Sequence, residues 1–332
     1  MVVAIAPVLI AIASFLLRIF NIASIKSMIF DEIYYVDGAR DLLKYGVEVT
    51  GADPEFVVHP PVGKWLIGSG IKLFGDNPLG WRFTTALVGS LMILIVAAIA
   101  HRLFYSPLLT ALASALMAVD GLALVHSRTA LLDNFLAFFI LTATYFFISR
   151  RYWWTGFFLG LALSTKWSAL YFIAAFGLIA LYRAFAHHTG RELIRPTLNR
   201  IAAFGILPVA VYITSWWGWF ASNRGWDRDH SSNPIASFIF YHKEMLNFHT
   251  GLTSKHPYEA NPWSWLIMGR PTSFYYETPK NCGASSCSQE VLALGTPLLW
   301  WLGTIAIAVV FGFWIRSFFT RRFDPAVTVI VA

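Results

Sequence analysis

Eight apolar runs separated by short polar connections limit what this chain can fold into more than any other feature. A helix needs about 20 mostly apolar residues to cross the hydrocarbon core of a bilayer. The runs cover residues 2–22, 84–100, 108–125, 130–148, 154–165, 167–182, 201–220 and 294–314, of which the fifth is short. Residues 326–332 are apolar but too few to span, and we expect them to begin a ninth helix, so that the chain ends inside it. The pattern predicts an all-α integral membrane protein.

The composition supports this class. Of the 332 residues, 57% are hydrophobic and 13% are charged, whereas soluble domains carry about 25% charged residues. Residues 2–20 lack the basic start and the small-residue cleavage site of a signal peptide. No repeat or Gly/Ser linker divides the chain, so we expect one polytopic membrane domain over residues 1–332.

Arginine is concentrated in alternate connections, which predicts the sidedness. Cytoplasmic connections carry excess Lys and Arg, and all the Arg-rich connections fall on one side if the eight spans alternate. They hold Arg102, Arg150, Arg151, Arg183, Arg191, Arg195, Arg200, Arg316, Arg321 and Arg322. We therefore expect a cytoplasmic N-terminus and two extracytoplasmic loops, residues 23–82 and 221–293, in which most of the carboxylates lie.

The net charge of +7 does not indicate nucleic-acid binding, because the basic residues punctuate apolar runs instead of forming a basic face. The two cysteines, Cys282 and Cys287, lie in the second outer loop, and we expect them to form a local disulfide. The loop also holds four histidines, but it has neither an H-E-x-x-H motif nor a compact His/carboxylate spacing, so the sequence does not predict a zinc site.

Two adjacent carboxylates, Asp31 and Glu32, follow the first span. Charge at a membrane boundary is costly unless it is paired or used. One reading is a functional pair, in which one carboxylate points into a cavity and a partner holds the other. The alternative is a solvated start of an amphipathic interfacial helix, where acidic residues suit the helix dipole.

A second segment runs from His59 through Pro60 and Pro61 to Lys64. Pro61 suits the first turn of a helix, which we expect to continue to about Phe74 and to lie in the membrane interface. Its apolar residues Trp65, Leu66, Ile71 and Phe74 would face lipid. Lys64 and Lys72 would then extend toward headgroups. The functional alternative is a lid that fixes His59 and Lys64 over a site.

Two outer turns between predicted spans carry further charges. Arg128 lies between the third and fourth spans, Asp133 lies at the outer end of the fourth, and Lys166 lies between the fifth and sixth. Arg offers a planar fork of donors suited to phosphate, and Lys166 suits a lipid phosphate. The alternatives are an ion pair of Arg128 with Asp133 or Asp31 that braces the helices, and a Lys166 that reaches bulk headgroups.

These segments together resemble the protein O-mannosyltransferase family, which uses mannose linked to a polyprenyl phosphate. The matching residues are Asp31-Glu32, His59-Pro60-Pro61-x-x-Lys64, Arg128 followed by Leu131-Leu132-Asp133, Lys166-Trp167, and Asn261-Pro262-Trp263-Ser264-Trp265 leading to Arg270-Pro271. The resemblance implies a GT-C-type glycosyltransferase. About 70 residues in the second outer loop leave no room for the extra soluble domain of eukaryotic members, so the sequence resembles a bacterial member, and the family has membrane helices beyond the eighth.

The resemblance also implies residue roles. Arg128 and Lys166 would bind the donor phosphate, and Asp31 would deprotonate a Ser or Thr hydroxyl of the acceptor protein, with inversion at the anomeric carbon. Glu32 would complete the catalytic pair by orienting the acceptor or Arg128. His59, Lys64 and Asp133 would shape the pocket, and Trp263, Trp265 and Arg270 would bound the acceptor side.

The implied partners are polyprenyl-phosphate-mannose, the bilayer and secreted acceptors that emerge from the translocon at the plasma membrane. No cofactor is required, although two acids and a phosphate could hold Mg²⁺ weakly. Two other functions remain open. One is a related transferase that delivers a lipid-linked sugar to a lipid or glycan, and the other is a secondary transporter, although the charges lie at one face and no repeat is visible.

Overall fold

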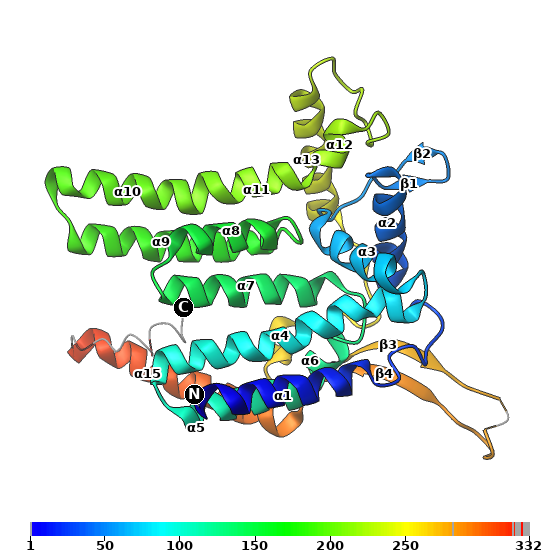
Figure 1. The fold of residues 1–332 in the computed structure, drawn as a ribbon, viewed down its shortest axis with the longest axis horizontal. Coiled ribbons are helices and arrows are strands. Elements are labelled where there is room, and N and C mark those ends of the chain that lie inside the picture. Colours follow the sequence, from blue (N-terminus) through cyan, green and yellow to red (C-terminus); the bar gives the residue numbers. More distant parts are fainter. Residues whose placement is uncertain (1, 281, 321, 323–326, 328–332) are drawn as a thin grey trace. The chain divides into compact units, whose positions relative to one another are not determined.

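The structure, a computed structural model, describes residues 2–280, 282–320, 322 and 327, and is mainly helical (Figure 1). The main helices are α1 (Val2–Ile19), α2 (Glu32–Tyr45), α3 (Val62–Phe74), α4 (Pro78–Phe104), α5 (Pro107–Val119), α6 (Gly121–His126), α7 (Leu132–Ile148), α8 (Tyr152–Leu163), α9 (Ala169–His187), α10 (Ile194–Ile201), α11 (Leu207–Ser215), α12 (Trp217–Ala221), α13 (Pro234–Gly251), α14 (Pro262–Trp265) and α15 (Pro297–Thr320). The predicted start of a ninth span, residues 326–332, lies outside the described residues except for Val327.

Each of the eight predicted spans is helical, and the chain is a multi-pass membrane protein. Within the described residues, four helical segments are long and apolar enough to cross a membrane: α4, α9, Gly190–Ser215 and α15. Three more, Ile5–Ile19, α5 and α7, are apolar but shorter. The fifth run forms α8, whose 12 residues extend only about 18 Å, well short of the roughly 30 Å hydrocarbon core.

Two antiparallel strand pairs depart from the all-α prediction. β1 (Val49–Thr50) pairs with β2 (Asp53–Pro54), and β3 (Thr272–Glu277) pairs with β4 (Gln289–Ala293). The aromatic and hydroxyl side chains of β3 suit a pleated, half-buried surface. The predicted disulfide between Cys282 and Cys287, in the loop of the second hairpin, is confirmed.

The chain divides into two compact units, and each is described by itself. The first comprises residues 1–22, 86–129 and 255–332. Here α1 packs against α5 through Ala11 and Ala118, with Ile93 of α4 in the same buried cluster. The third predicted span breaks at Asp120, which accepts a capping hydrogen bond from Ala123 N (2.9 Å) at the start of α6.

Asp120 also ties α6 to the start of α15. Its other carboxylate oxygen accepts hydrogen bonds from Thr296 N (3.2 Å) and Trp300 Nε1 (2.9 Å). One carboxylate therefore satisfies backbone donors at two helix starts, which otherwise have no partner within their own helices.

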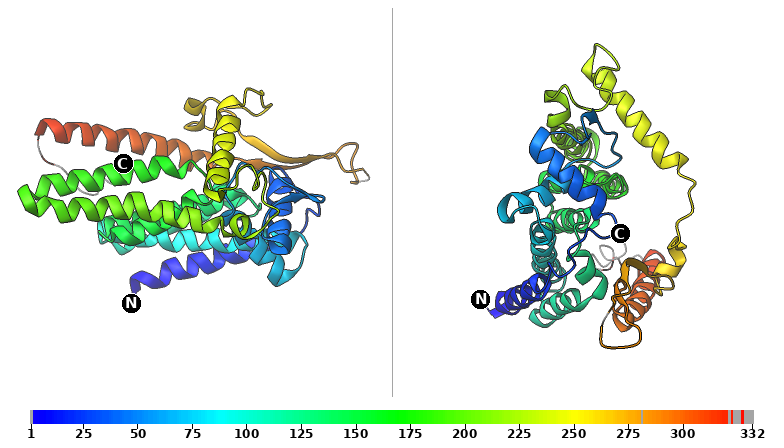
Figure 2. Two further views of the ribbon diagram at one scale, coloured as in Figure 1. Left: turned by 90° about the horizontal axis from the view of Figure 1, so that it is seen from above. Right: turned by 90° about the vertical axis from the view of Figure 1, so that its right-hand side faces the viewer.

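The second unit comprises residues 23–85 and 130–254. Helices α7, α8, α9 and α11 form its bundle, and α2, α3, α12 and α13 gather at one end of it (Figure 1). Helix α13 runs across the direction of the bundle helices instead of along it (Figure 2). The turn between α8 and α9 and the start of α7 lie at that same end.

Small residues allow the bundle helices of the second unit to pack closely. A π-helical turn, Ala202–Ile206, lies between α10 and α11, and it packs against α8. A Cβ atom on Gly156 of α8 would lie 1.8 Å from the Ala203 carbonyl oxygen. Only glycine fits at this contact.

We expect Gly156→Ala to lower the free energy of unfolding by about 1–3 kcal/mol, because the added methyl group forces two helix backbones apart. The measurement is thermal unfolding in detergent. Gly205→Ala is the matched control, since a Cβ there meets nothing within 4 Å. Equal stability of the two variants would contradict this account of the packing.

Candidate active site

Three of the predicted polar segments converge at one end of the second unit. Val62 N, at the start of α3, donates a hydrogen bond to Ser164 O (3.0 Å) in the turn after α8. A Cβ on Gly63 would lie 2.5 Å from Leu132 Cδ2 at the start of α7. The His59–Lys64 segment therefore packs directly against the segments that carry Asp133 and Lys166.

Glu32 anchors the start of α2 in this unit. Its side chain is 0% exposed, and its carboxylate pairs with Arg82 in the first turns of α4, through Arg82 Nε (2.7 Å) and NH2 (2.6 Å). Backbone N–H groups of Ile29 (3.0 Å) and Ala130 (2.7 Å) donate to the same carboxylate. Arg82 also donates to Ile25 O and Ser27 O, both at 2.9 Å.

This pairing bears on the expected catalytic role of Glu32. Both carboxylate oxygens accept two hydrogen bonds from the protein, and Glu32 has no exposed surface. A buried ion pair is tolerated when further hydrogen bonds satisfy both charged groups. The geometry therefore favours a role for Glu32 in joining α2, α4 and the segment before α7.

Asp31 is at the N-cap position of α2. Both readings of the segment therefore hold in part, because the segment starts a helix and one of its two carboxylates, Glu32, is held by Arg82. Asp31 is partly exposed, and it accepts a hydrogen bond from Tyr35 OH (3.4 Å) one turn later. Burial raises the pKa of Tyr35 far above its usual range, and the carboxylates of Asp31 and Asp133 act in the same direction. Tyr35 therefore remains a neutral hydrogen-bond donor close to both carboxylates.

Lys166 is held by Asp133. Its Nζ lies 2.9 Å from Asp133 Oδ1 and 3.0 Å from Oδ2, and both side chains are partly accessible to solvent. A Lys ammonium has three donors, so this pairing leaves Lys166 able to bind an anion as well.

Lys64 does not extend toward headgroups, and that interpretation was wrong. Its side chain is buried, with Nζ 2.7 Å from Glu48 Oε1 and 3.3 Å from His59 O. Helix α3 forms as predicted, and Trp65 and Phe74 of its expected lipid face are 40% and 41% exposed, but Ile71 is only 8% exposed. Glu48 provides an internal partner for the ammonium, and a buried charge requires one.

His59 lies among these charges. Burial lowers the pKa of His59 to about 3, and the positive charges of Lys166 and Lys64 act in the same direction, against the carboxylate of Asp133. The imidazole ring is therefore neutral at physiological pH. It can donate and accept a hydrogen bond without adding a third positive charge.

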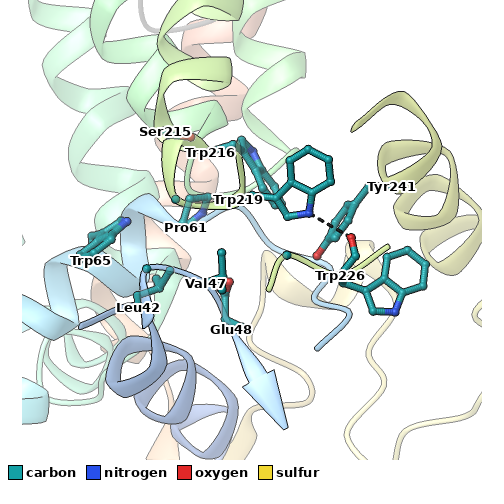
Figure 3. A pocket seen from close by; sticks show the side chains of 13 residues that line it. Leu42, Val47, Glu48, Pro61, Trp65, Ser215, Trp216, Trp219, Trp226 and Tyr241 are labelled. Atoms are coloured by element: carbon teal, nitrogen blue, oxygen red, sulfur yellow. Dashed lines mark hydrogen bonds between the residues drawn. The ribbon is translucent and has the colours of Figure 1, made fainter. Parts of the chain in front are cut away.

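The second unit also has a separate small pocket with an aromatic lining (Figure 3). Its lining includes Glu48, Trp65, Trp216, Trp219, Trp226 and Tyr241. Tyr241 OH donates to Val57 O (2.9 Å) and accepts from Val57 N (3.0 Å). Helix α13 thus holds the backbone two residues before His59.

Arg128 belongs to the first unit, where it closes the end of α1. Its NH1 group donates hydrogen bonds to Leu17 O, Arg18 O and Phe20 O, each at 2.8 Å. The last carbonyls of a helix lack partners within the helix. These hydrogen bonds do not test phosphate binding, so the expected role of Arg128 stays a prediction.

The predicted acceptor-side residues also belong to the first unit. Trp263 and Trp265 of α14 are 80% and 59% exposed, and Arg270 NH2 donates to Pro257 O. After α14 the backbone is held by α15, because Trp301 Nε1 donates to Ile267 O (3.2 Å) and Thr304 Oγ1 donates to Leu266 O (2.8 Å). The acceptor-side role of Trp263, Trp265 and Arg270 stays a prediction.

Within the described part of the chain, no group of three or more His, Cys, Asp and Glu side chains is arranged to hold a metal ion.

Two family models match nearly the whole chain. Residues 8–220 match the dolichyl-phosphate-mannose-protein mannosyltransferase model, and residues 234–328 match the C-terminal four TMM region of protein-O-mannosyltransferase. A polyprenol-phosphate-mannose–protein mannosyltransferase of Corynebacterium glutamicum is 34% identical, over 92% of this chain and 70% of that protein. One from Mycobacterium tuberculosis is 33% identical, over 97% and 72%. The chain belongs to the protein O-mannosyltransferase family.

A solved structure, that of the archaeal oligosaccharyltransferase AglB from Archaeoglobus fulgidus, is similar with a TM-score of 0.46 and 15% identity, covering 75% of this chain and 37% of that one.

For this member of the protein O-mannosyltransferase family, sequence reasoning missed several residues of the site. Arg82, Tyr35 and His249 contact predicted site residues, and Trp167, named above only as a motif residue, contacts His249. Arg82 did carry a signal, because an arginine in the first turns of an apolar helix needs an acidic partner. The others are aromatic or His side chains that the sequence does not distinguish from an interfacial belt.

We expect Glu32→Gln to lower the free energy of unfolding by about 3–5 kcal/mol, because it leaves the buried Arg82 without its counter-charge. Asp37→Asn, which weakens an exposed pair with Arg40, should cost no more than about 1 kcal/mol. Thermal unfolding in detergent measures both. A Glu32→Gln variant as stable as Asp37→Asn would show that the Glu32–Arg82 pair does not stabilise the fold.

We expect His59 to make the protein less stable in acid. The unfolded chain binds a proton at His59 near pH 6.5, but the folded chain does so only near pH 3, so stability falls by about 1.4 kcal/mol for each pH unit below 6.5. His59→Gln should remove this part of the pH dependence. Unfolding measured at pH 7 and pH 5 gives the comparison, and an unchanged pH dependence in the variant would contradict the assignment.

Proposed function

We propose that the chain transfers mannose from polyprenyl-phosphate-mannose to Ser or Thr hydroxyls of proteins. The observation that carries this proposal is the assembly of Asp31, His59, Asp133 and Lys166 at one end of the second unit. These residues supply a general base, a cation for phosphate and neutral groups for a sugar. Family membership supports the same donor and acceptor classes.

Lys166 binds the phosphate of the donor in this proposal. The donor is a phosphodiester, and its phosphate gains negative charge as the bond to the anomeric carbon breaks. A fixed cation beside the phosphate oxygen that leaves the anomeric carbon stabilises the transition state more than the ground state. Asp133 orients the ammonium. The family resemblance implies Arg128 as a further phosphate-binding residue.

Asp31 acts as the general base. The hydroxyl oxygen of the acceptor attacks the anomeric carbon, its proton passes to Asp31, and polyprenyl phosphate leaves with the electrons of the broken bond. A single displacement inverts the configuration at that carbon. Glu32 takes no part in proton transfer here: it is a positioning residue that holds Asp31 through the start of α2.

The reaction takes place at the extracytoplasmic face of the plasma membrane, and the N-terminus is cytoplasmic. The distribution of arginine supports this orientation, because the site lies at the bundle end opposite the Arg-rich connections Arg150–Arg151 and Arg183–Arg200. Acceptors would reach the site as they emerge from the translocon, and Trp263, Trp265 and Arg270 are the residues proposed to contact them. The proposed steps require no metal, and Mg²⁺ would at most bind weakly beside the carboxylates.

We expect Asp31→Asn to lower kcat for mannose transfer by about 10²–10⁴-fold, the usual contribution of a general base. Asp53→Asn, in the exposed strand β2 of the same loop, should leave the rate within twofold. The assay follows radiolabelled mannose from polyprenyl-phosphate-mannose to a Ser/Thr-rich peptide in membranes.

A near-native rate for Asp31→Asn would reject this residue as the base. Transfer by the native chain to a lipid or glycan, with none to the peptide, would instead favour a related transferase with another acceptor. Solute movement into liposomes without any transfer would indicate a transporter.

A further inference from the structure

Four rings follow one another across the candidate site, and we name them the ring wall: Tyr35, His59, His249 and Trp167. The centroids of Tyr35 and His59 are 5.9 Å apart, those of His59 and His249 are 5.8 Å apart, and those of His249 and Trp167 are 5.7 Å apart. Neighbouring rings are therefore close enough for contact. They come from α2, the segment before α3, α13 and the turn before α9, all within the second unit.

The two ends of the ring wall meet the proposed catalytic groups. At one end, Tyr35 OH donates to Asp31. At the other end, Trp167 directly follows Lys166 in the chain. The charges of Lys166 and Asp133 both act on His59 in the middle of the wall, so Lys166, which would hold the phosphate, lies beside the rings.

Hydrogen bonds fix Trp167 in one orientation. Its Nε1 donates to Tyr212 OH (3.0 Å), and Tyr212 OH is 2.8 Å from His242 Nε2. His242 Nδ1 lies 2.7 Å from Phe238 O, which can only accept, so Nδ1 carries the proton and Nε2 accepts from Tyr212. Each hydrogen bond in the series from Trp167 through Tyr212 to His242 therefore has a defined donor and acceptor.

His249 is oriented in a similar way. Its Nε2 lies 3.1 Å from Val58 O, which makes this nitrogen the donor. Because Val58 adjoins His59, the same contact joins the two imidazole rings of the wall. The rings are thus set before any ligand binds, which lowers the entropic cost of binding.

We propose that the ring wall is the binding surface for the sugar ring of the lipid-linked donor, with Trp167 as its main platform. This inference rests on the proposed function. A hexose has apolar C–H faces that pack on aromatic rings, and hydroxyl groups that bond to Tyr OH and imidazole nitrogens. A sugar joined to a phosphate on Lys166 would lie next to Trp167, and Asp31 is bonded to Tyr35 of the same wall.

The test compares two ligands that differ only in the sugar: polyprenyl-phosphate-mannose and polyprenyl phosphate. Binding to the whole chain in detergent is measured for the native protein and for Trp167→Ala. We expect Trp167→Ala to weaken binding of the mannose-bearing lipid at least tenfold and of polyprenyl phosphate less than twofold. Trp153→Ala, an exposed tryptophan at the other end of α8, is the matched control and should change neither.

Tyr212→Phe keeps the ring but removes the hydroxyl that orients Trp167. We expect a smaller loss, about threefold, again only for the mannose-bearing lipid. This variant keeps the proposal testable if Trp167→Ala does not fold.

Several results would overturn the inference. Equal losses for both ligands would assign Trp167 to the phosphate or to folding, and no loss for either would remove the wall from the donor site. A rise in the KM for the peptide alone would place the acceptor on the wall. A sugar-dependent loss without any transfer to peptide would support the wall while rejecting a protein acceptor.

Discussion

The site depends on one buried ion pair, Glu32 with Arg82. Neither charge could stay in the interior without its partner, because desolvation would cost more than the fold can offset. Here the pair is complete: the carboxylate accepts four hydrogen bonds, and the guanidinium also caps two backbone carbonyls. It thereby joins the start of α2, the start of α4 and the backbone at Ala130.

This constraint positions the proposed chemistry around it. Asp31 precedes Glu32, so fixing the start of α2 also fixes Asp31 and Tyr35, while the hydrogen bond to Ala130 N fixes the segment that leads to Asp133. Two further pairs, Lys64 with Glu48 and Lys166 with Asp133, neutralise the remaining charges. His59 is neutral because burial and two ammonium groups oppose its protonation. The result is a polar site at the end of an apolar bundle.

Much of this was predictable, since membrane helices and polar residues at their ends leave strong patterns in a sequence. The eight helical runs, α3 and the disulfide between Cys282 and Cys287 follow from local composition. The partners of charged residues do not. Glu32 and Arg82 are 50 positions apart, and neither of the two interpretations of Lys64 included its pairing with Glu48. The β3–β4 hairpin was missed although β3 has strand-forming residues, and the ring wall was missed because its members come from four separate segments.

A structure of the chain with polyprenyl-phosphate-mannose bound would test the central claim most directly. The account predicts the donor phosphate within hydrogen-bond distance of Lys166 Nζ, the sugar ring against Trp167, and the Asp31 carboxylate on the side of the anomeric carbon opposite the phosphate. A phosphate held away from Lys166, or an Asp31 on the same side of the anomeric carbon as the phosphate, would contradict it.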